Sequence, residues 1–516
     1  MMTATNSDLA SADPSGRLYN PDLAPVPKKE RTWGWYSIFA VWMSVAHNAA
    51  SYTFAAGLFL LGLNGWQILI SVLAGTLVLY VGCAMSGVIG QRTGLPFPVL
   101  SRVSWGLFGA NIPALIRGII AIFWYGIQTY LASVAISVLL VRINPGLESW
   151  TEHSFLGLHA LGWMSFLALW LIQWLVIGFG MDMVRRFQEW AGPVVWVVML
   201  VLAVWLVVQA KGHIDFSLSV KQLSGGQQAH LMLTSAALVV SQLATLALNF
   251  CDFGRFVRSS RAVRVGTMLG APLNWTAFSV TSVVISVGSV TVFGQALLDP
   301  AELLGKVPNT GLLIVGVFLF AFATIGVNIV SNFVSPAYDL ANVWPKKITF
   351  RRGGAISSVA AILVMPWKLF SSPIVINYFL GALGAFLGPL FAIMMLDYYV
   401  VQRRRVLVEG LFRVDGSAYA YKRGVNPKAI AAFVPSAALS AVLALVPVFE
   451  NVAPFAWLIG GAVAAGLYHA MNRTATRRPV VELGVVEAGS ESTGAGRLLS
   501  PSADSSSDGA INPTAP

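Results

Sequence analysis

The stretch that decides the fold is residues 32–91, which read TWGWYSIFAVWMSVAHNAASYTFAAGLFLLGLNGWQILISVLAGTLVLYVGCAMSGVIGQ. These 60 residues, between Arg31 and Arg92, contain no Asp, Glu, Lys or Arg. One helix across a membrane needs about 20 apolar residues, so the stretch predicts two such helices in a hairpin. The segment Leu63–Asn64–Gly65 lies near its middle and predicts the turn between them.

The whole chain shares the character of this stretch. It has 516 residues, of which 56% are hydrophobic and 11% charged, whereas a soluble chain carries roughly a quarter charged residues. The composition argues against a soluble enzyme, a nucleic-acid-binding protein and a disordered scaffold. The net charge of +11 comes from short basic clusters between apolar runs, which is typical of membrane-protein loops. The two cysteines, Cys83 and Cys251, form no metal motif.

Further uncharged runs of similar length follow the first one. They lie between Arg117 and Arg142, Glu152 and Asp182, Glu189 and Lys211, Lys221 and Asp252, Arg264 and Asp299, Lys306 and Asp339, Lys368 and Asp397, Lys428 and Glu450, and Glu450 and Arg473. A shorter run between Arg352 and Lys368 is only marginally long enough for a span. The pattern predicts an all-α polytopic membrane protein with twelve transmembrane helices.

Charge predicts the orientation of these helices. Alternate turns carry basic clusters such as Lys28–Lys29, Arg185–Arg186 and Arg403–Arg405, while the others carry mainly acidic residues. Basic turns favour the cytoplasm, so we expect a cell-membrane (plasma or inner) protein with both termini cytoplasmic. We expect a disordered N-terminus over 1–30, ten helices over 31–402, a cytoplasmic loop over 403–427, two additional helices over 428–472 and a disordered tail over 473–516.

Polar residues interrupt four of the predicted spans at similar depth. They fall within residues 42–52 of the first span, 124–129 of the third, 241–245 of the sixth and 323–332 of the eighth. A buried amide without a partner is costly in lipid, so four such patches predict one shared polar cavity.

The spacing within these patches indicates what the cavity binds. Trp124 and Gln128 are four residues apart and share a helix face, and Asn328 and Asn332 repeat that spacing. A flat heterocycle needs an indole to stack on and amides for its ring edge. The alternative is that the amides only bridge helices, and spacing alone does not decide between the two.

The titratable residues near the spans fall into two groups. Asp182, Asp252, Asp339 and Asp397 lie close to predicted cytoplasmic helix ends, where we expect ion pairs or helix-end contacts, with proton carriage as the alternative. His47 is the titratable residue near the middle of the first span. It is either a neutral histidine bonded to a carbonyl or a proton-linked switch.

Several segments together resemble the class 1 nucleobase:cation symporters, which include hydantoin, cytosine, uracil and allantoin permeases. The segments are 20–27 with 31–33, 94–99, 109–117, 124–129, 247–253 with Arg255, and 332–339. The resemblance implies a leucine-transporter-like fold, in which spans 1–5 and 6–10 are inverted repeats and helices 1 and 6 are broken. It also implies that Trp124 stacks on the substrate, that Gln128 and Asn332 bond its imide edge, and that Asn48 lies nearby.

Two positions depart from the family pattern. Leu243, preceded by Gln242, stands where hydantoin-type members have a second tryptophan, which puts a two-sided aromatic sandwich in doubt. Gly326 and Val327 stand where sodium-using members have hydroxyls. A hard cation wants about five or six oxygen ligands. The remaining candidates for coupling are His47 and the carbonyls of Ser44, His47 and Ala323, so we favour a proton over sodium as the coupling ion.

The sequence thus predicts a secondary active transporter that imports a small planar nitrogen heterocycle by alternating access. Uracil or a related pyrimidine is the first choice, and allantoin, hydantoin, cytosine or a purine are alternatives. An enzyme would need a metal cluster or a nucleophile–base set, and a channel would need a charged ring or filter repeat, and none is visible. We expect a monomer in the lipid bilayer, with no cofactor or bound metal apart from the coupling ion and no nucleic-acid partner.

Overall fold

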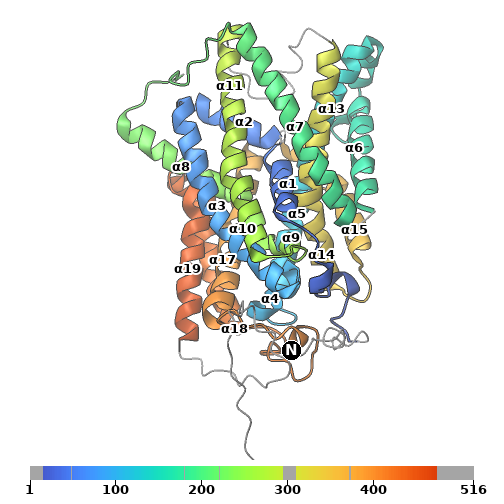
Figure 1. Cartoon of the computed structure of the whole chain (residues 1–516), viewed down its shortest axis with the longest axis vertical. Coiled ribbons are helices and arrows are strands. Elements are labelled where there is room, and N and C mark those ends of the chain that lie inside the picture. The colour runs from blue at the N-terminus through green and yellow to red at the C-terminus, as the bar shows by residue number, and fades with distance from the viewer. Residues whose placement is uncertain are drawn as a thin grey trace, which may run out of the picture.

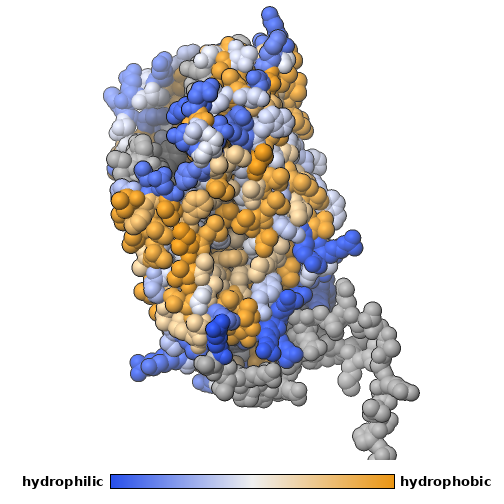
Figure 2. All heavy atoms as spheres, turned by 90° about the vertical axis from the view of Figure 1, so that its left-hand side faces the viewer, coloured by the Kyte–Doolittle hydropathy of each residue, from blue (hydrophilic) through white to orange (hydrophobic). Residues whose placement is uncertain are grey.

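The computed structural model describes residues 16–47, 49–178, 181–219, 221–294, 310–370 and 373–473. It shows a bundle of long helices that run along a common direction, with the N-terminal segment at one end (Figure 1). We call this the N-terminal end of the bundle. On the face that Figure 2 shows, apolar side chains cover the middle and polar side chains gather toward both ends. This surface is that of a protein that spans a membrane.

Helices make up most of the described chain. In chain order they are α1 (Trp35–Ala46), α2 (Ala49–Leu60), α3 (Gly65–Thr93), α4 (Phe97–Trp105), α5 (Asn111–Ile143), α6 (Ala160–Gly178), α7 (Met181–Gln209), α8 (Gly225–Asn249), α9 (Cys251–Gly254), α10 (Ser260–Met268), α11 (Trp275–Phe293), α13 (Thr310–Val327), α14 (Val334–Val343), α15 (Phe350–Leu363), α16 (Pro366–Phe370), α17 (Pro373–Leu396), α18 (Pro427–Leu445) and α19 (Ala456–Asn472). Strands β1 (Ser154–Phe155) and β2 (Leu158–His159) pair antiparallel, with Ser154 opposite His159.

Nine helical stretches of the described residues are long and apolar enough to cross a membrane. They are Gly65–Thr93, Asn111–Ile143, Met181–Gln209, Gly225–Asn249, Ser260–Phe293, Leu313–Val343, Gly384–Val401, Pro427–Leu445 and Ala453–Asn472. Two shorter apolar helices, Trp35–Ala46 and Ala160–Leu175, accompany them. A polytopic helical membrane protein is therefore confirmed, while the count of twelve spans stays a prediction.

The predicted hairpin turn lies where the sequence placed it. Helix α2 ends at Leu60 and α3 begins at Gly65. Asn64 caps α3 by accepting a bond from the Gln67 backbone N–H at 3.0 Å, and the Gln67 side chain accepts from the Asn64 N–H at 3.0 Å. This reciprocal capping box satisfies two backbone donors that the first turn of a helix leaves free, and so fixes the start of α3.

The first span is broken and the sixth is not. Helix α1 ends at Ala46, and His47 leaves the helical conformation with φ −90° and ψ 73° before α2 resumes at Ala49. Helix α8 instead continues through residues 241–245 as far as Asn249. The expectation of a break in helix 6 is wrong, because residues 227–249 contain neither glycine nor proline to interrupt the hydrogen-bond ladder.

Three long helical segments contain a wider, π-helical turn. These turns are η5 (Leu269–Asn274) between α10 and α11, η6 (Asn328–Phe333) between α13 and α14, and η7 (Asp397–Val401) after α17. A π turn inserts an extra residue into a helix and is frequent at functional sites. Turn η6 carries both asparagines that the sequence singled out.

The N-terminal segment is ordered from residue 16, although we expected disorder over residues 1–30. The Asn20 side chain donates to the carbonyls of Pro345 and Ile348 at 2.9 and 2.8 Å. The Arg255 side chain donates to the carbonyls of Asp22 and Ala24. These bonds hold a short polar segment that composition alone marks as unstructured. Residues 1–15 and the predicted tail from 474 lie outside the described residues.

Candidate substrate-binding site

Helix α5 carries the first two predicted site residues. Gln128 is buried, and Trp124 is half-buried and packs against the hydrophobic core. The Gln128 Oε1 atom is buried and accepts no hydrogen bond from any described residue. A buried amide oxygen without a partner is costly, so this atom is available to a ligand that can donate an N–H.

The asparagines of η6 form a bonded pair. Asn332 Nδ2 donates to Asn328 Oδ1 at 2.9 Å, which confirms that the two side chains share a face. Asn328 Nδ2 in turn lies 3.0 Å from Thr129 Oγ1 and 2.9 Å from Gln173 Oε1. Asn328 therefore bridges η6 to α5 and α6, as the alternative interpretation of these amides proposed. Asn332 makes its single side-chain bond to Asn328 within the described part of the chain.

Gln173 is a member of this network that sequence reasoning missed. It lies on α6, is fully buried, and its Nε2 donates to Thr129 Oγ1 at 3.2 Å and to the Leu169 carbonyl at 3.1 Å. Its one signal in the sequence is a lone amide within an otherwise apolar run. Gln173 holds Asn328 in place and thereby supports the position of Asn332.

Gln242 and Leu243 lie on different faces of α8. Gln242 lies two turns before Asn249 on the same helix face, and Asn249 Oδ1 accepts a bond from Arg117 of α5. The Gln242 Oε1 atom is buried and without a partner in the described chain. Leu243 is buried four residues after Val239, which packs against Gly75 of α3. Leu243 thus lies on the stripe of α8 that faces α3.

Helix geometry places Trp124 and Gln242 at the same level. Trp124 lies seven residues after Arg117 on α5, and Gln242 lies seven residues before Asn249 on α8. At 1.5 Å per residue, both lie about 10 Å from the Arg117–Asn249 contact, on the same faces as those residues. Gln128 lies one turn beyond Trp124. We call Trp124, Gln128, Gln242 and Asn332 the amide layer. The predicted neighbour Asn48 lies outside the described residues.

His47 lies at the break between α1 and α2 and is enclosed by aromatic rings. Its Nε2 atom is 3.2 Å from Asn274 Oδ1, which also accepts a bond from Trp196 Nε1 at 2.7 Å. Since the indole N–H can only donate, the shared atom is an oxygen and His47 Nε2 must carry a hydrogen. The rings of Trp196 and Phe278 lie 5.1 and 4.9 Å from the imidazole. This surrounding fits a histidine that holds the break against η5.

The crossing of α1 and α13 offers few ligands for a sodium ion. Ala323 and Val327 are buried and apolar, and Gly326 has no side chain. Gln188 Nε2 donates to the Gly326 carbonyl at 3.0 Å, so an amide hydrogen points at that oxygen. The Ser44 hydroxyl is buried and without a partner in the described chain. The side chains of this crossing therefore offer one hydroxyl, so a hard cation would have to take its other ligands from backbone carbonyls.

The four acidic residues differ in their surroundings. Asp182 forms an ion pair with Arg185 at 3.7 Å, and Asp252 accepts the backbone N–H of Phe97 at the start of α4, as predicted. Asp397 accepts a bond from Tyr468 at 2.8 Å. Asp339 makes neither an ion pair nor a helix-end contact among the described residues, so the expectation was wrong for it. It is buried because α5 packs against it at Gly118.

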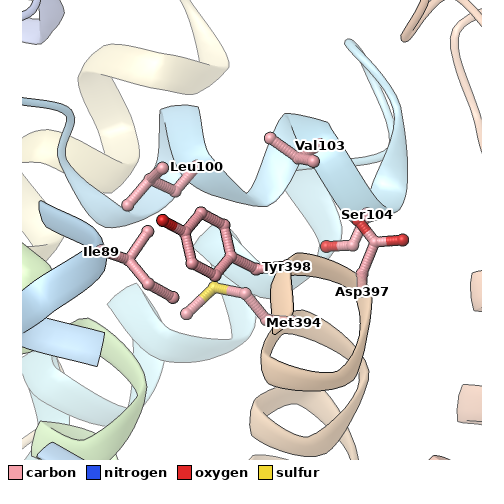
Figure 3. A pocket seen from close by; sticks show the side chains of 7 residues that line it. All are labelled: Ile89, Leu100, Val103, Ser104, Met394, Asp397 and Tyr398. Atoms are coloured by element: carbon pink, nitrogen blue, oxygen red, sulfur yellow. The ribbon is translucent and has the colours of Figure 1, made fainter. Parts of the chain in front are cut away.

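A small pocket lies away from the amide layer, between α3, α4 and α17 near the N-terminal end. Figure 3 shows the Tyr398 ring beside Ile89, Leu100 and Met394, with Asp397 close to Ser104. The lining is mostly apolar and contains no residue that the sequence predicted for the site. It offers no stacking surface paired with amides, unlike the amide layer.

Comparison with known proteins assigns the chain to a family. A family model described as a permease for cytosine/purines, uracil, thiamine and allantoin matches residues 25–460. The chain belongs to the nucleobase:cation symporter-1 family. The members of this permease family are transporters, so the expectation that the chain is not an enzyme is confirmed.

Individual relatives agree with this assignment. An allantoin permease of Bacillus subtilis is 36% identical, and the match covers 90% of this chain and 95% of that protein. A purine-uracil permease of Arabidopsis thaliana is 32% identical over 88% of this chain and 78% of its own. The structure of Mhp1, a nucleobase-cation-symport-1 family transporter in a closed conformation with bromovinylhydantoin bound, matches with a TM-score of 0.72 at 24% identity. That match covers 87% of this chain and 94% of Mhp1 and confirms the fold.

Proposed function

We propose that this permease imports a small cyclic ureide, with allantoin as the first candidate and uracil as the second, in symport with a proton. The observation that carries the proposal is the amide layer. It combines an indole with two buried amide oxygens, on Gln128 and Gln242, that have no partner in the described chain. Substrate would stack on Trp124 and bond to these oxygens and to Asn332.

The chemistry of the layer favours allantoin over uracil, which the sequence placed first. Unpartnered acceptors select ligands rich in N–H groups. Allantoin adds a ureido arm to a hydantoin ring and has more N–H groups than uracil. The ring carbon that bears this arm is tetrahedral, so one face of the ring is not flat. The order of the two candidates also agrees with the Bacillus subtilis relative, which is an allantoin permease.

Proton coupling is supported by the poor fit of the α1–α13 crossing to sodium. The Gln188 amide already donates to the Gly326 carbonyl, and positions 326 and 327 supply no hydroxyl. The expected location, oligomeric state and orientation are also part of the proposal. The transporter would lie in the cell membrane as a monomer, with the N-terminal end and both termini in the cytoplasm.

Counterflow in proteoliposomes tests the proposal. Vesicles that contain the purified protein are loaded with unlabelled allantoin and diluted into labelled allantoin, with uracil, thymine, cytosine, hydantoin, hypoxanthine and thiamine as competitors. We expect transient accumulation of label that allantoin inhibits best and uracil next. A channel would show no exchange stimulation, and an enzyme would convert the label. Accumulation that only a purine or thiamine inhibits would contradict the substrate assignment.

A further inference from the structure

Below the amide layer, toward the N-terminal end, lies a buried group of charged side chains that the proposed substrate site does not use. Arg117 on α5, Asp252 on α9 and Asp339 on α14 are each at most 1% exposed. Ionised, these three would hold two negative charges and one positive charge, and the buried Arg255 guanidinium adds a second positive charge that acts on Asp252. A buried ionised group without hydrogen bonds is costly, so the protonation of each carboxyl matters for the stability of the group.

The bonds of Asp252 identify it as the charged carboxylate of the two. Its Oδ1 accepts the Phe97 N–H at 2.7 Å, and its Oδ2 accepts from Asn249 Nδ2 at 3.2 Å and Ser335 Oγ at 3.3 Å. Three donors from three segments replace the water that an ionised carboxylate would otherwise hold. Arg255 and Arg117 both attract its negative charge, and Arg255 is the stronger of the two.

Asp339 receives no such support. Neither of its oxygens has a hydrogen-bond partner in the described chain, and no cation lies within 4 Å of it there. A Cβ placed on Gly118 would lie 3.7 Å from Asp339 Oδ2, so the backbone of α5 closes one side. The charge of Asp252 repels an ionised Asp339, and Arg117 attracts it. A proton on Asp339 removes a negative charge that no hydrogen bond or ion pair supports in the described chain.

Arg117 connects this group to the amide layer. Its Nη2 donates to the Ser331 carbonyl at 2.7 Å and its Nε to Asn249 Oδ1 at 3.4 Å, while Nη1 is buried without a partner in the described residues. Ser331 directly precedes Asn332 of the amide layer. If Asp339 loses its proton, the free Nη1 of Arg117 is a buried donor that can turn toward the carboxylate, because Arg117 is the cation that attracts Asp339.

Other charged groups around α14 already have partners or face outward. They are Arg102 on α4, bonded to Asn342, Asp22, bonded to the Phe350 N–H, Arg255, over the Tyr338 ring, and Arg351 and Arg352 on α15, both exposed. His47 is not an alternative proton site of the same kind, since it faces the Asn274 amide and two aromatic rings.

We propose that Asp339 binds the proton that is coupled to substrate uptake, and this rests on the proposed function. The proton enters with the substrate and neutralises the Asp339 carboxylate while Arg117 holds the Ser331 carbonyl. Release of the proton toward the N-terminal end leaves a carboxylate, which draws Arg117 away from Ser331. The pull of Arg117 on the backbone beside Asn332 then weakens rebinding of the substrate, whereas the protonated form still exchanges bound for free substrate. Arg117 stays positively charged throughout.

The test compares Asp339→Asn with wild type in proteoliposomes, using labelled allantoin. Asparagine keeps the shape of the side chain and cannot release a proton. We expect Asp339→Asn to lose accumulation driven by an inward acid gradient and to keep counterflow, which needs no net proton movement. Asp182→Asn, at an exposed ion pair, is the matched control and should retain both activities.

The outcomes separate this proposal from the proposed function. Gradient-driven accumulation by Asp339→Asn equal to wild type would overturn the proton site, and absence of counterflow in wild type with any of the heterocycles would overturn the function. A measurement on wild type alone covers the case in which the variant does not fold. Its infrared spectrum at neutral pH should show the carbonyl stretch of a protonated carboxylic acid, and absence of that band would overturn the proposal.

Discussion

The two buried polar regions of this permease differ in charge and in how their hydrogen bonds are filled. The amide layer is neutral, and two of its acceptor oxygens have no partner among the described residues. In the charged group around Arg117, the Asp252 carboxylate accepts three hydrogen bonds. The Asp339 carboxyl has no hydrogen bond in the described chain. Unfilled neutral groups suit a ligand that brings its own donors, and an unsupported carboxylate suits a proton. On the two proposals above, substrate and coupling ion would bind in separate places.

The largest expected effect concerns the charged group. Asp252→Ala removes the carboxylate that Phe97, Asn249 and Ser335 surround, and with it the negative charge that attracts the buried Arg255 and Arg117. Breaking a buried pair in this way costs about 3–5 kcal/mol of stability. Thermal unfolding in detergent should show a large fall in midpoint, while Asp182→Ala at the exposed pair should leave it near wild type. Equal midpoints for the two variants would show that the group is not a buried charge network.

The next effect concerns the indole of the amide layer. Trp124→Ala removes the stacking surface, and loss of a buried aromatic contact costs about 2 kcal/mol of binding. This corresponds to an affinity about 30-fold weaker. Equilibrium binding of labelled allantoin measures it, and Trp124→Phe, which keeps a smaller ring, should lie between the two. An unchanged affinity in Trp124→Ala would remove Trp124 from the site.

A smaller effect is expected at η6. Asn332→Ala removes one hydrogen bond to the substrate and should weaken binding by about 1–2 kcal/mol. Asn328→Ala is the informative comparison, since Asn328 bridges helices and its loss should lower stability more than affinity. Binding affinity and thermal unfolding are measured on both variants. A larger loss of affinity in Asn328→Ala and a larger loss of stability in Asn332→Ala would exchange the roles of the two asparagines.

The smallest effect is expected from sodium. Replacing sodium with choline should leave allantoin uptake unchanged, because the α1–α13 crossing supplies too few oxygen ligands, and a protonophore should abolish accumulation. The double substitution Gly326→Ser and Val327→Thr would add two hydroxyls at this crossing. The serine has room, because a Cβ on Gly326 would lie no closer than 3.4 Å to its neighbours. Strict sodium dependence of the wild type would contradict proton coupling.

Sequence reasoning succeeded where the decisive signal is local. The turn at Asn64 follows from the length of one uncharged run, and the shared face of Asn328 and Asn332 follows from their spacing. It failed where the signal comes from distant packing. The solitary position of Gln173 gives no hint of its bond to Thr129, and Asp339 is buried because Gly118 of α5 lies against it. The break expected in α8 came from resemblance alone, and the local residues do not produce it.

The ordered N-terminal segment has a consequence for how the chain is made. Asn20 and Asp22 bond to residues 345–350, and Trp33 pairs with residues 256–258. These partners are synthesised more than two hundred residues later, so the segment has nothing to bind while the ribosome is still adding the first helices. The part of the described chain that is made first is therefore among the last to reach its final place.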